Sequence, residues 1–241
     1  MAKPTYKRIL LKVSGEVLAG DQSFGIETAY LEATARQIVD AAKAGVQIAI
    51  VPGGGNIFRG MSVAAGGADR VTADMMGTLG TVINALALSG EISRQGLKSK
   101  VFSATTMPSV ADTYTARAAR AALDDGYVIV LGGGTGNPFF TTDTAAALRA
   151  IELECDVLLK GTKVDGVYSE DPKKNPKATR YETVSYDEVI ARNLKVMDTA
   201  AFALARDNGL PILVYALDDK EGLMGVLNGK VRSTLVGSLK K

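Results

Sequence analysis

The stretch Tyr127-Val-Ile-Val-Leu131, followed directly by Gly132-Gly-Gly-Thr-Gly136, carries the pattern that sets the expected fold. Its apolar residues are continuous rather than alternating, which is typical of a strand buried on both faces of a mostly parallel sheet. The same plan recurs at Val46 to Val51, which runs through Pro52 into Gly53-Gly-Gly55. The chain therefore places glycine-rich turns directly after buried strands.

Helical periodicity fills the segments between these strands. A third apolar run, Lys7 to Val13, ends in Ser14-Gly15, and Ser185 and Glu188 have capping-box spacing for a short helix. Strands that alternate with helices predict an α/β fold with a mostly parallel central sheet sandwiched by helices. The expected helices are 27–44, 69–94, 112–123, 143–154 and 198–208, and the expected strands are 7–13, 46–51, 100–104, 127–131, 156–159, 212–215 and 233–236.

Composition excludes several functional classes. The chain has 241 residues with 28 basic and 26 acidic side chains, a formal net charge of +2, so neither nucleic acid nor a membrane surface is expected as a partner. The start of the chain shows no signal-peptide pattern and no apolar run reaches bilayer length. One cysteine, Cys155, permits no intrachain disulfide and is expected in the core rather than as a catalytic thiol. A cytoplasmic location is expected.

The chain contains no histidine. This excludes Ser-His-Asp and Cys-His catalysis, histidine-ligated zinc and a histidine general base. Any chemistry must therefore use lysine, arginine, carboxylates, hydroxyls and backbone amides.

Several loops are expected to meet at one edge of the sheet, because ligands of open parallel sheets bind beyond the carboxyl ends of the strands. Glycine lets backbone N–H groups approach an anion closely, and a following helix N-terminus adds a favourable partial charge. A tight turn alone would also explain any single glycine loop. Three such loops at the same edge favour an anion-binding site.

In chain order, the first loop is Lys12 to Gly15 and the second is Gly53 to Gly60, and each contains one cation of interest. Lys12 lies near the end of a buried strand, where lysine is rare unless paired, and is a candidate for neutralising a transferring phosphoryl group. The alternative is a lysine that reaches solvent from a strand end. Arg59, four residues past Gly55, is a candidate for a bidentate contact with phosphate, or else a solvated surface residue. This second loop lacks the spacing of a P-loop and of a dinucleotide fingerprint.

The third loop, Gly132 to Asp143, contains several hydrogen-bonding side chains between a strand and the start of a helix. They are Thr135, Asn137, Thr141 and Thr142, and Asp143 follows at the expected helix N-terminus. Asp143 is a candidate for the acid that orients the lysines around the phosphates. The alternative is a helix N-cap at Asp143 or Thr142.

The fourth loop, Lys160 to Pro172, follows another strand and contains Lys160, Lys163 and Tyr168. Asp165-Gly166 resembles the turn of a hairpin that would join Lys163-Val164 to Val167-Tyr168. A plain solvated hairpin is the alternative to a binding role. Which of the two lysines faces the phosphates stays open.

Four motifs in order resemble the bacterial UMP kinase family, within the amino acid kinase fold. They are Lys-Arg-Ile-Leu-Leu-Lys-Val-Ser-Gly at 7–15, Gly-Gly-Gly-Asn-Ile-Phe-Arg-Gly at 53–60, Gly-Thr-Gly-Asn-Pro-Phe-Phe-Thr-Thr-Asp at 134–143 and Lys-Val-Asp-Gly-Val-Tyr at 163–168. The resemblance covers essentially the whole chain. The third motif is the most specific, because related kinases of carbamate, acetylglutamate and aspartate are expected to share only the Lys-Ser-Gly and triple-glycine parts.

The resemblance implies an enzyme that transfers the γ-phosphoryl group of ATP to UMP, giving UDP and ADP in pyrimidine nucleotide biosynthesis. It implies an acceptor (UMP) lobe at 1–155 and an ATP-binding lobe at 156–241, which form one continuous α/β domain. Mg²⁺ is expected with ATP, held mostly by phosphates and water, and no protein metal site is expected.

The resemblance and the proposed chemistry together assign three sets of site residues. The expected catalytic residues are Lys12, Asp143 and Lys160. The expected ATP-binding residues are Lys12, Val13, Ser14, Gly15, Gly55, Arg59, Thr162, Tyr168 and Asp171. The expected UMP-binding residues are Gly54, Asp74, Thr135, Gly136, Asn137, Pro138, Phe139, Phe140, Thr141 and Thr142.

The resemblance also implies a homohexamer, with GTP as a possible activator and UTP as a possible inhibitor. The segment Gly20 to Gly25 falls where family members have a region tied to GTP activation. Two other functions stay open from the residues alone. One is a sibling kinase acting on a carbamate or an amino-acid carboxylate, and the other is a regulator that binds UMP or UTP without turnover.

Overall fold

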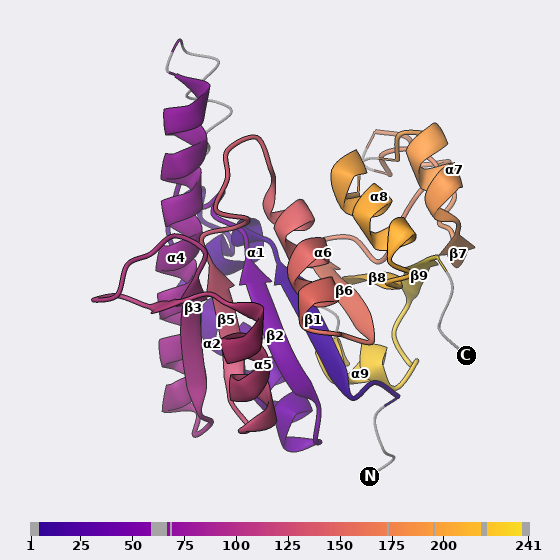
Figure 1. Ribbon diagram of the computed structural model, residues 1–241. Coiled ribbons are helices and arrows are strands. Elements are labelled where there is room, and N and C mark those ends of the chain that lie inside the picture. The colour runs from indigo at the N-terminus through magenta and orange to yellow at the C-terminus, as the bar shows by residue number, and fades with distance from the viewer. Residues whose placement is uncertain are drawn as a thin grey trace.

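The computed structural model contains one nine-stranded sheet with helices on both faces (Figure 1). The structure describes residues 5–58, 67, 69–172, 174–194, 196–217 and 221–237. The strands are β1 (Arg8–Val13), β2 (Gln47–Pro52), β3 (Ser99–Ser103), β4 (Asp112–Thr113), β5 (Val128–Gly132), β6 (Val157–Thr162), β7 (Thr183–Val184), β8 (Ile212–Ala216) and β9 (Ser233–Val236). The helices are α1 (Gly15–Ala19), α2 (Thr28–Lys43), α4 (Arg70–Arg94), α5 (Ala116–Asp124), α6 (Thr142–Glu152), α7 (Tyr186–Ala191), α8 (Thr199–Asp207) and α9 (Gly222–Leu227).

The sheet is mostly parallel, as the continuous apolar strands predict. Its order is β4-β3-β5-β2-β1-β6-β8-β9-β7. Only the β8–β9 pair is antiparallel among the pairs of named strands. The β1 strand is central, between β2 and β6, so the residues that follow it lie in the middle of the carboxyl edge.

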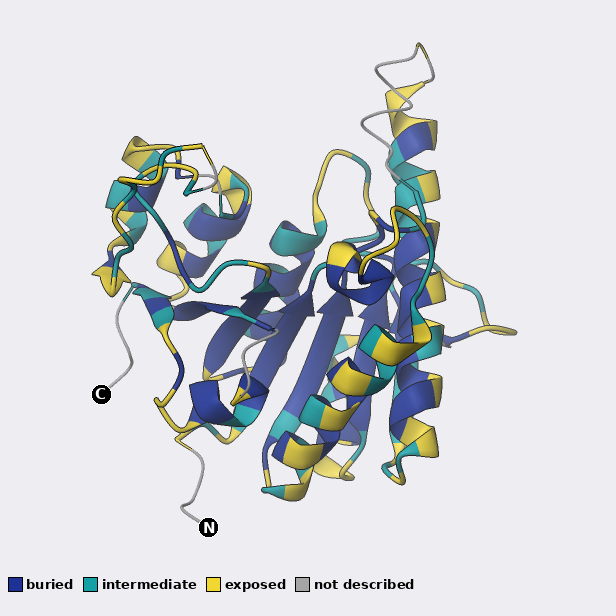
Figure 2. Ribbon diagram, turned by 180° about the vertical axis from the view of Figure 1, so that it is seen from behind, coloured by how far each residue is buried: buried dark blue, intermediate teal, exposed yellow. Residues whose placement is uncertain are grey.

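Burial on both faces explains why the central strands are apolar throughout. Side chains alternate between the two faces of a strand. In β1, Ile9 and Leu11 enter the core formed with α1, α2, α4 and α9, whereas Leu10 enters the core formed with α5, α6, α7 and α8. Figure 2 shows the resulting layers, with buried strands between helices whose outer faces are exposed.

The α4 helix is the longest element. By length and composition it is the one helix in the described part of the chain that could cross a bilayer. Its Ala85, Leu88 and Ile92 instead pack in one core with Val128 and Val130 of β5. The apolar residues of its inner face thus cover the sheet.

Most expected elements are present within a few residues of their predicted ends. The expected helix 112–123 begins only at Ala116, because Asp112 and Thr113 pair with Phe102 and Ser103 as β4. The short α1 and α9 helices were not expected. Cys155 is buried, as expected, and burial raises the pKa of its thiol to about 12.

The hairpin expected around Asp165-Gly166 was wrong. Tyr168 forms an antiparallel bridge with Arg180, and the Tyr181 N–H donates to the Val167 carbonyl over 2.8 Å. Val167 is fully buried and its N–H donates to Thr234 Oγ1. Long-range burial therefore pairs residues 167–169 with 179–181, a choice that turn chemistry alone does not reveal.

Candidate active site

Lys12 and Lys160 lie side by side at the carboxyl edge of the sheet. They are register partners on the adjacent parallel strands β1 and β6, so their side chains leave the sheet on the same face. Both residues are only 7% exposed. Buried lysines need a counter-charge, and the chain supplies one from the next layer.

Asp143 is that counter-charge. Its two carboxylate oxygens contact the two lysines separately, with Oδ1 at 3.1 Å from Lys12 Nζ and Oδ2 at 2.6 Å from Lys160 Nζ. The N-cap of α6 is Thr141, whose hydroxyl accepts from the N–H groups of Asp143 and Thr144. The alternative of a capping role for Asp143 or Thr142 is therefore wrong, and the Asp143 side chain points to the lysines instead.

Burial and ion pairing act in opposite directions on the pKa values of this cluster. Burial would raise the pKa of the Asp143 carboxyl, but the ion pairs with Lys12 and Lys160 outweigh burial and keep that pKa below its ordinary value. Burial lowers the pKa of Lys160, an effect to which Lys12 adds and which Asp143 opposes only in part. Asp143 thus contacts both lysine ammonium groups, and Asp198 adds a further negative charge near Lys160.

A second carboxylate ties the cluster to the C-terminal part of the chain. Asp198, the N-cap of α8, accepts hydrogen bonds from Ala201 N, Thr144 Oγ1 and Thr141 Oγ1. Lys160 Nζ also donates to the carbonyl of Val196, close to this cap. The start of α6 is therefore held by α8 as well as by its own cap.

The first two glycine loops are in direct contact beside the lysines. The Gly53 N–H donates to the Val13 carbonyl over 2.8 Å. A Cβ on Gly53 would lie 2.9 Å from Gly15 N, and a Cβ on Gly15 would lie 2.3 Å from Asn56 Oδ1. Glycine is therefore required at both positions for steric reasons, and the backbone amides of the two loops are brought close together.

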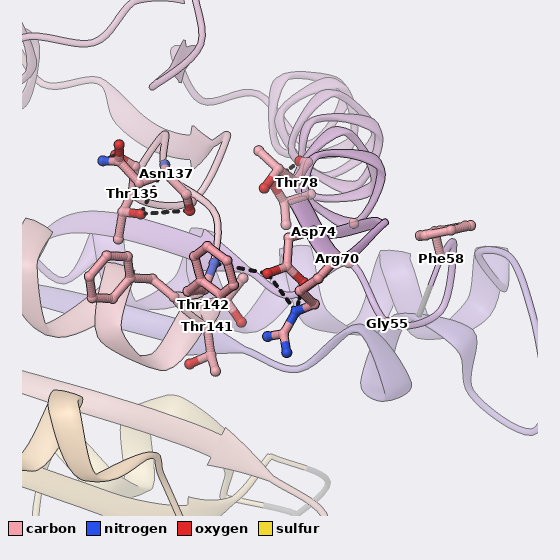
Figure 3. A pocket seen from close by; sticks show the side chains of 15 residues that line it. Gly55, Phe58, Arg70, Asp74, Thr78, Thr135, Asn137, Thr141 and Thr142 are labelled. Carbon is pink, nitrogen blue, oxygen red and sulfur yellow. Dashed lines mark hydrogen bonds and ion pairs between the residues drawn. The ribbon is translucent and has the colours of Figure 1, made fainter. Parts of the chain in front are cut away.

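A pocket of about 250 Å³ lies between the second and third loops and α4 (Figure 3). It collects most of the residues expected to bind UMP, from three separate parts of the sequence. Gly136 and Pro138 of the expected set do not line it. Its lining residues are Gly54, Gly55, Phe58, Arg70, Asp74, Gly77, Thr78, Thr81, Gly134, Thr135, Asn137, Phe139, Phe140, Thr141 and Thr142.

Asp74 joins α4 to the third loop. It accepts from the Phe139 N–H over 2.8 Å and from Arg70 Nε over 2.8 and 2.9 Å (Figure 3). The Arg70 guanidinium also lies 5.5 Å from the centre of the Phe139 ring. Phe139 has a φ of 70°, a left-handed conformation uncommon for a bulky residue. The loop is thus held in a strained conformation against an ion pair at the mouth of the pocket.

The expected ATP-binding residues are less closely gathered. Lys12, Val13, Ser14 and Gly15 are continuous at the end of β1, and Thr162 ends the neighbouring β6. The Tyr168 hydroxyl donates to Asp165 Oδ1 over 2.6 Å, which restricts the orientation of the Tyr168 ring. Asp171 lies further along the fourth loop and is exposed. Arg59 lies outside the described residues.

A second hollow of about 380 Å³ is lined by residues of α1, the segment after it, the second loop and the fourth loop. Its lining combines part of the segment Gly20 to Gly25 with Lys163 and Asn56, and Lys163 Nζ donates to the Gly20 carbonyl. Lys163 therefore faces this hollow, whereas Lys160 faces Asp143. The lining residues are Glu16, Ala19, Gly20, Gln22, Ser23, Asn56 and Lys163.

Sequence reasoning missed several residues that the tertiary structure brings to the first pocket. Arg70, Thr78 and Thr81 belong to a helix whose pattern reads as an ordinary cover of the sheet. The available signal was the unusual run of small and polar residues on one face of that helix. Phe58 was missed as well, although it lies within the second motif.

Comparisons with known proteins agree over nearly the whole chain. The model of the amino acid kinase family matches residues 7–216. The chain is 54% identical over 234 residues to the uridylate kinase of Brucella anthropi, covering 97% of this chain and 98% of that protein. It is 51% identical over 235 residues to the uridylate kinase of Agrobacterium fabrum, covering 98% of each.

Two solved structures superpose closely on this chain. The UMP kinase of Bacillus anthracis superposes with a TM-score of 0.92 at 40% identity, covering 96% of each chain. The UMP kinase of Ureaplasma parvum superposes with a TM-score of 0.91 at 37% identity, covering 99% of this chain and 100% of that one.

Proposed function

The chain belongs to the uridylate kinases of the amino acid kinase family, and we propose that it transfers the γ-phosphoryl group of ATP to UMP, giving UDP and ADP. The reaction serves pyrimidine nucleotide biosynthesis. The observation that carries the proposal is the Lys12–Asp143–Lys160 cluster, which holds two buried lysines beside a pocket lined by the third motif.

The proposed chemistry is an in-line displacement. A phosphate oxygen of UMP attacks the γ-phosphorus of ATP, and the bond to the oxygen bridging the β- and γ-phosphates breaks to release ADP. Such a reaction needs positioning and charge stabilisation more than covalent chemistry. An ionised phosphate acceptor has no proton to lose, so the absence of histidine from the chain is no obstacle.

Three residues are proposed to stabilise the transferring group. Lys12 and Lys160 supply positive charge, and Asp143 holds both ammonium groups in place. The backbone N–H groups of the glycine loops are proposed to contact the phosphates. The remaining ATP- and UMP-binding assignments stay predictions that binding experiments with single variants test.

Magnesium is proposed to arrive with ATP. The described residues contain no group of three or more acidic, cysteine or histidine side chains that could hold a metal ion, and Asp143 is engaged by two lysines. The residues present suit a magnesium ion that is bound by ATP phosphates and water with few protein ligands. When bound, it would neutralise charge on the β- and γ-phosphates.

The division of labour along the chain is also a proposal. We assign residues 1–155 to the UMP lobe and 156–241 to the ATP lobe of one continuous domain. The central pairing of β1 with β6 supports a reaction centre at the junction of these two parts. A cytoplasmic location stays a prediction.

The homohexamer is proposed from α4. Four large apolar side chains on its outer face are exposed at three- and four-residue spacing, Met76, Leu79, Ile83 and Leu86. A second copy of the chain is the proposed cover. Sedimentation of Leu79→Asp should then give a smaller species than wild type, and equal sizes would contradict this interface.

Regulation by GTP and UTP is also proposed. The expected GTP segment borders the second hollow through Gly20, Gln22 and Ser23. Adding GTP should raise turnover and adding UTP should lower it. Turnover that neither nucleotide changes would remove regulation from the proposal.

The experiment that tests the function is a coupled assay of ADP release with several acceptors. UMP should give the highest kcat/KM when compared with CMP, dUMP and AMP. Preference for carbamate, acetylglutamate or aspartate would indicate a sibling kinase. Binding of UMP without ADP release would indicate a regulator.

A further inference from the structure

Asn84 is a fully buried amide in the middle of α4. A buried polar side chain inside a helix is costly unless it is hydrogen-bonded. Both N–H bonds of the Asn84 amide are used, since Nδ2 donates to the Gly53 carbonyl over 2.6 Å and to Asn56 Oδ1 over 2.7 Å. Asn84 thus links α4 to Gly53, the first glycine of the triple-glycine loop.

Asn56 completes a reciprocal amide pair. Its Nδ2 donates to Asn84 Oδ1 over 3.1 Å and to the Gly25 carbonyl over 2.8 Å. Both amides therefore face a backbone carbonyl on their outer side. Turning either amide over would place its oxygen against a carbonyl oxygen, so only asparagine in this orientation satisfies the two sites.

The loop itself has no side chains with which to fix its position. Gly54 lies so close to α4 that a Cβ there would be 2.6 Å from the Gly77 carbonyl oxygen and 2.9 Å from Thr81 N. The helix surface under the loop consists of small residues, which permits this approach. The position of the loop therefore depends on the contacts that α4 supplies, together with the hydrogen bond from the Gly53 N–H to the Val13 carbonyl.

Thr81 makes the equivalent contact with the third loop. Its Oγ1 accepts from the Gly133 N–H over 2.8 Å and donates to the Thr78 carbonyl over 2.7 Å. Thr81 and Asn84 are three residues apart and so lie on the same face, about one helical turn from each other. One turn of α4 thus contacts both glycine loops.

We propose that Thr81 and Asn84 are positioning residues that set the spacing between the loops at Gly53–Gly55 and Gly132–Gly136. The inference rests on the proposed kinase function, in which these loops hold the reacting phosphates. Neither side chain needs to touch a reacting atom. A displacement of about 1 Å at a reaction centre can cost about 10²-fold in rate, so these contacts are expected to affect turnover more than folding.

Thr81 offers a matched pair of variants. Thr81→Val keeps the shape of the side chain but removes the acceptor for Gly133, whereas Thr81→Ser keeps the hydroxyl. We expect kcat to fall about 10²-fold in Thr81→Val and to stay near the wild-type value in Thr81→Ser. Amide exchange at Gly133 should accelerate only in the valine variant. Equal kcat in all three proteins would overturn the role of Thr81.

Asn84→Asp tests the other contact, because a carboxylate of the same size cannot donate to Gly53 or Asn56. Ser89→Ala is the control, since Ser89 is a buried residue of the same helix that contacts Ser99 rather than a loop. At a temperature where thermal melts show each protein folded, kcat should fall about 10²-fold in Asn84→Asp only.

Three outcomes are distinguishable. A wild-type protein that does not phosphorylate UMP contradicts the proposed function. A wild-type enzyme with active Thr81→Val and Asn84→Asp variants contradicts the positioning role alone. If Asn84→Asp does not fold, the Thr81 pair decides the inference, because a lowered melting temperature with unchanged kcat in Thr81→Val would show a purely structural contact.

Discussion

Two carboxylates at the site, Asp143 and Asp74, have side chains that are equally exposed at 14% but cationic partners that differ. The lysines beside Asp143 have side chains only 8% and 9% exposed, whereas the Arg70 side chain beside Asp74 is 44% exposed. An exposed arginine can swing into solvent at little cost, but a buried lysine cannot. The comparison indicates a rigid lysine cluster, the proposed reaction centre, beside a more adaptable pocket, the proposed acceptor site.

The largest expected effect is the loss of a buried lysine. Lys12→Ala removes one of two fixed charges, so kcat should fall about 10²–10³-fold while UMP still binds. The measurement is steady-state turnover together with equilibrium UMP binding. Lys100→Ala is the control, because Lys100 has a side chain 42% exposed on β3. Wild-type turnover in Lys12→Ala would end the claim that the buried cluster is the reaction centre.

A smaller effect is expected at the ion pair of Asp74 with Arg70. Asp74→Ala removes the acceptor of the Phe139 N–H, so KM for UMP should rise about 10-fold, with a smaller change in kcat. Arg70→Ala should raise the same KM by about fivefold at most, since solvent screens its ion pair. A kcat loss in Asp74→Ala as large as that in Lys12→Ala would erase the difference between the two regions.

The pH dependence of stability tests the ion pairs of Asp143. The Asp143 pKa is held below its ordinary value of 3.8 in the folded protein. Its contribution to stability is therefore fully present above pH 3.8 and is lost as the pH falls through the lower folded-state pKa. Urea unfolding at several pH values should show a weaker loss of stability in acid for Asp143→Asn than for wild type. An equal loss of stability in acid for the two proteins would contradict this role of Asp143.

The smallest expected effect concerns Phe139 in the pocket. Phe139→Gly relieves the left-handed backbone conformation but adds freedom to the unfolded chain, so the unfolding free energy should change by less than about 1 kcal/mol. Chemical denaturation measures this difference. Destabilisation well beyond that range would mean that the pocket is as rigid as the lysine cluster.

Sequence reasoning anticipated the cluster better than the pocket. Lys12 was recognisable because a lysine near the end of an apolar strand is unusual, and Asp143 because it starts a helix after a glycine loop. Lys160 was a candidate, but the sequence did not separate it from Lys163. Arg70 and Thr81 were not recognisable, because their helix has many apolar residues and because the contacts of Arg70 with the Phe139 ring and of Thr81 with Gly133 join distant parts of the chain. Asp74 was expected only through the family resemblance.

By itself, the sequence of this protein determined a mostly parallel α/β fold, glycine loops at strand ends, the family, and a chemistry without histidine. Those properties follow from local patterns, since apolar continuity, glycine placement and residue type are written along the chain. Only the tertiary structure decided that Lys12 faces Lys160, that Thr141 rather than Asp143 caps α6, that residues 167–169 pair with 179–181, and that Thr81 and Asn84 hold two loops. Strand register and the packing of distant segments set those contacts, and neither is encoded within a single short segment.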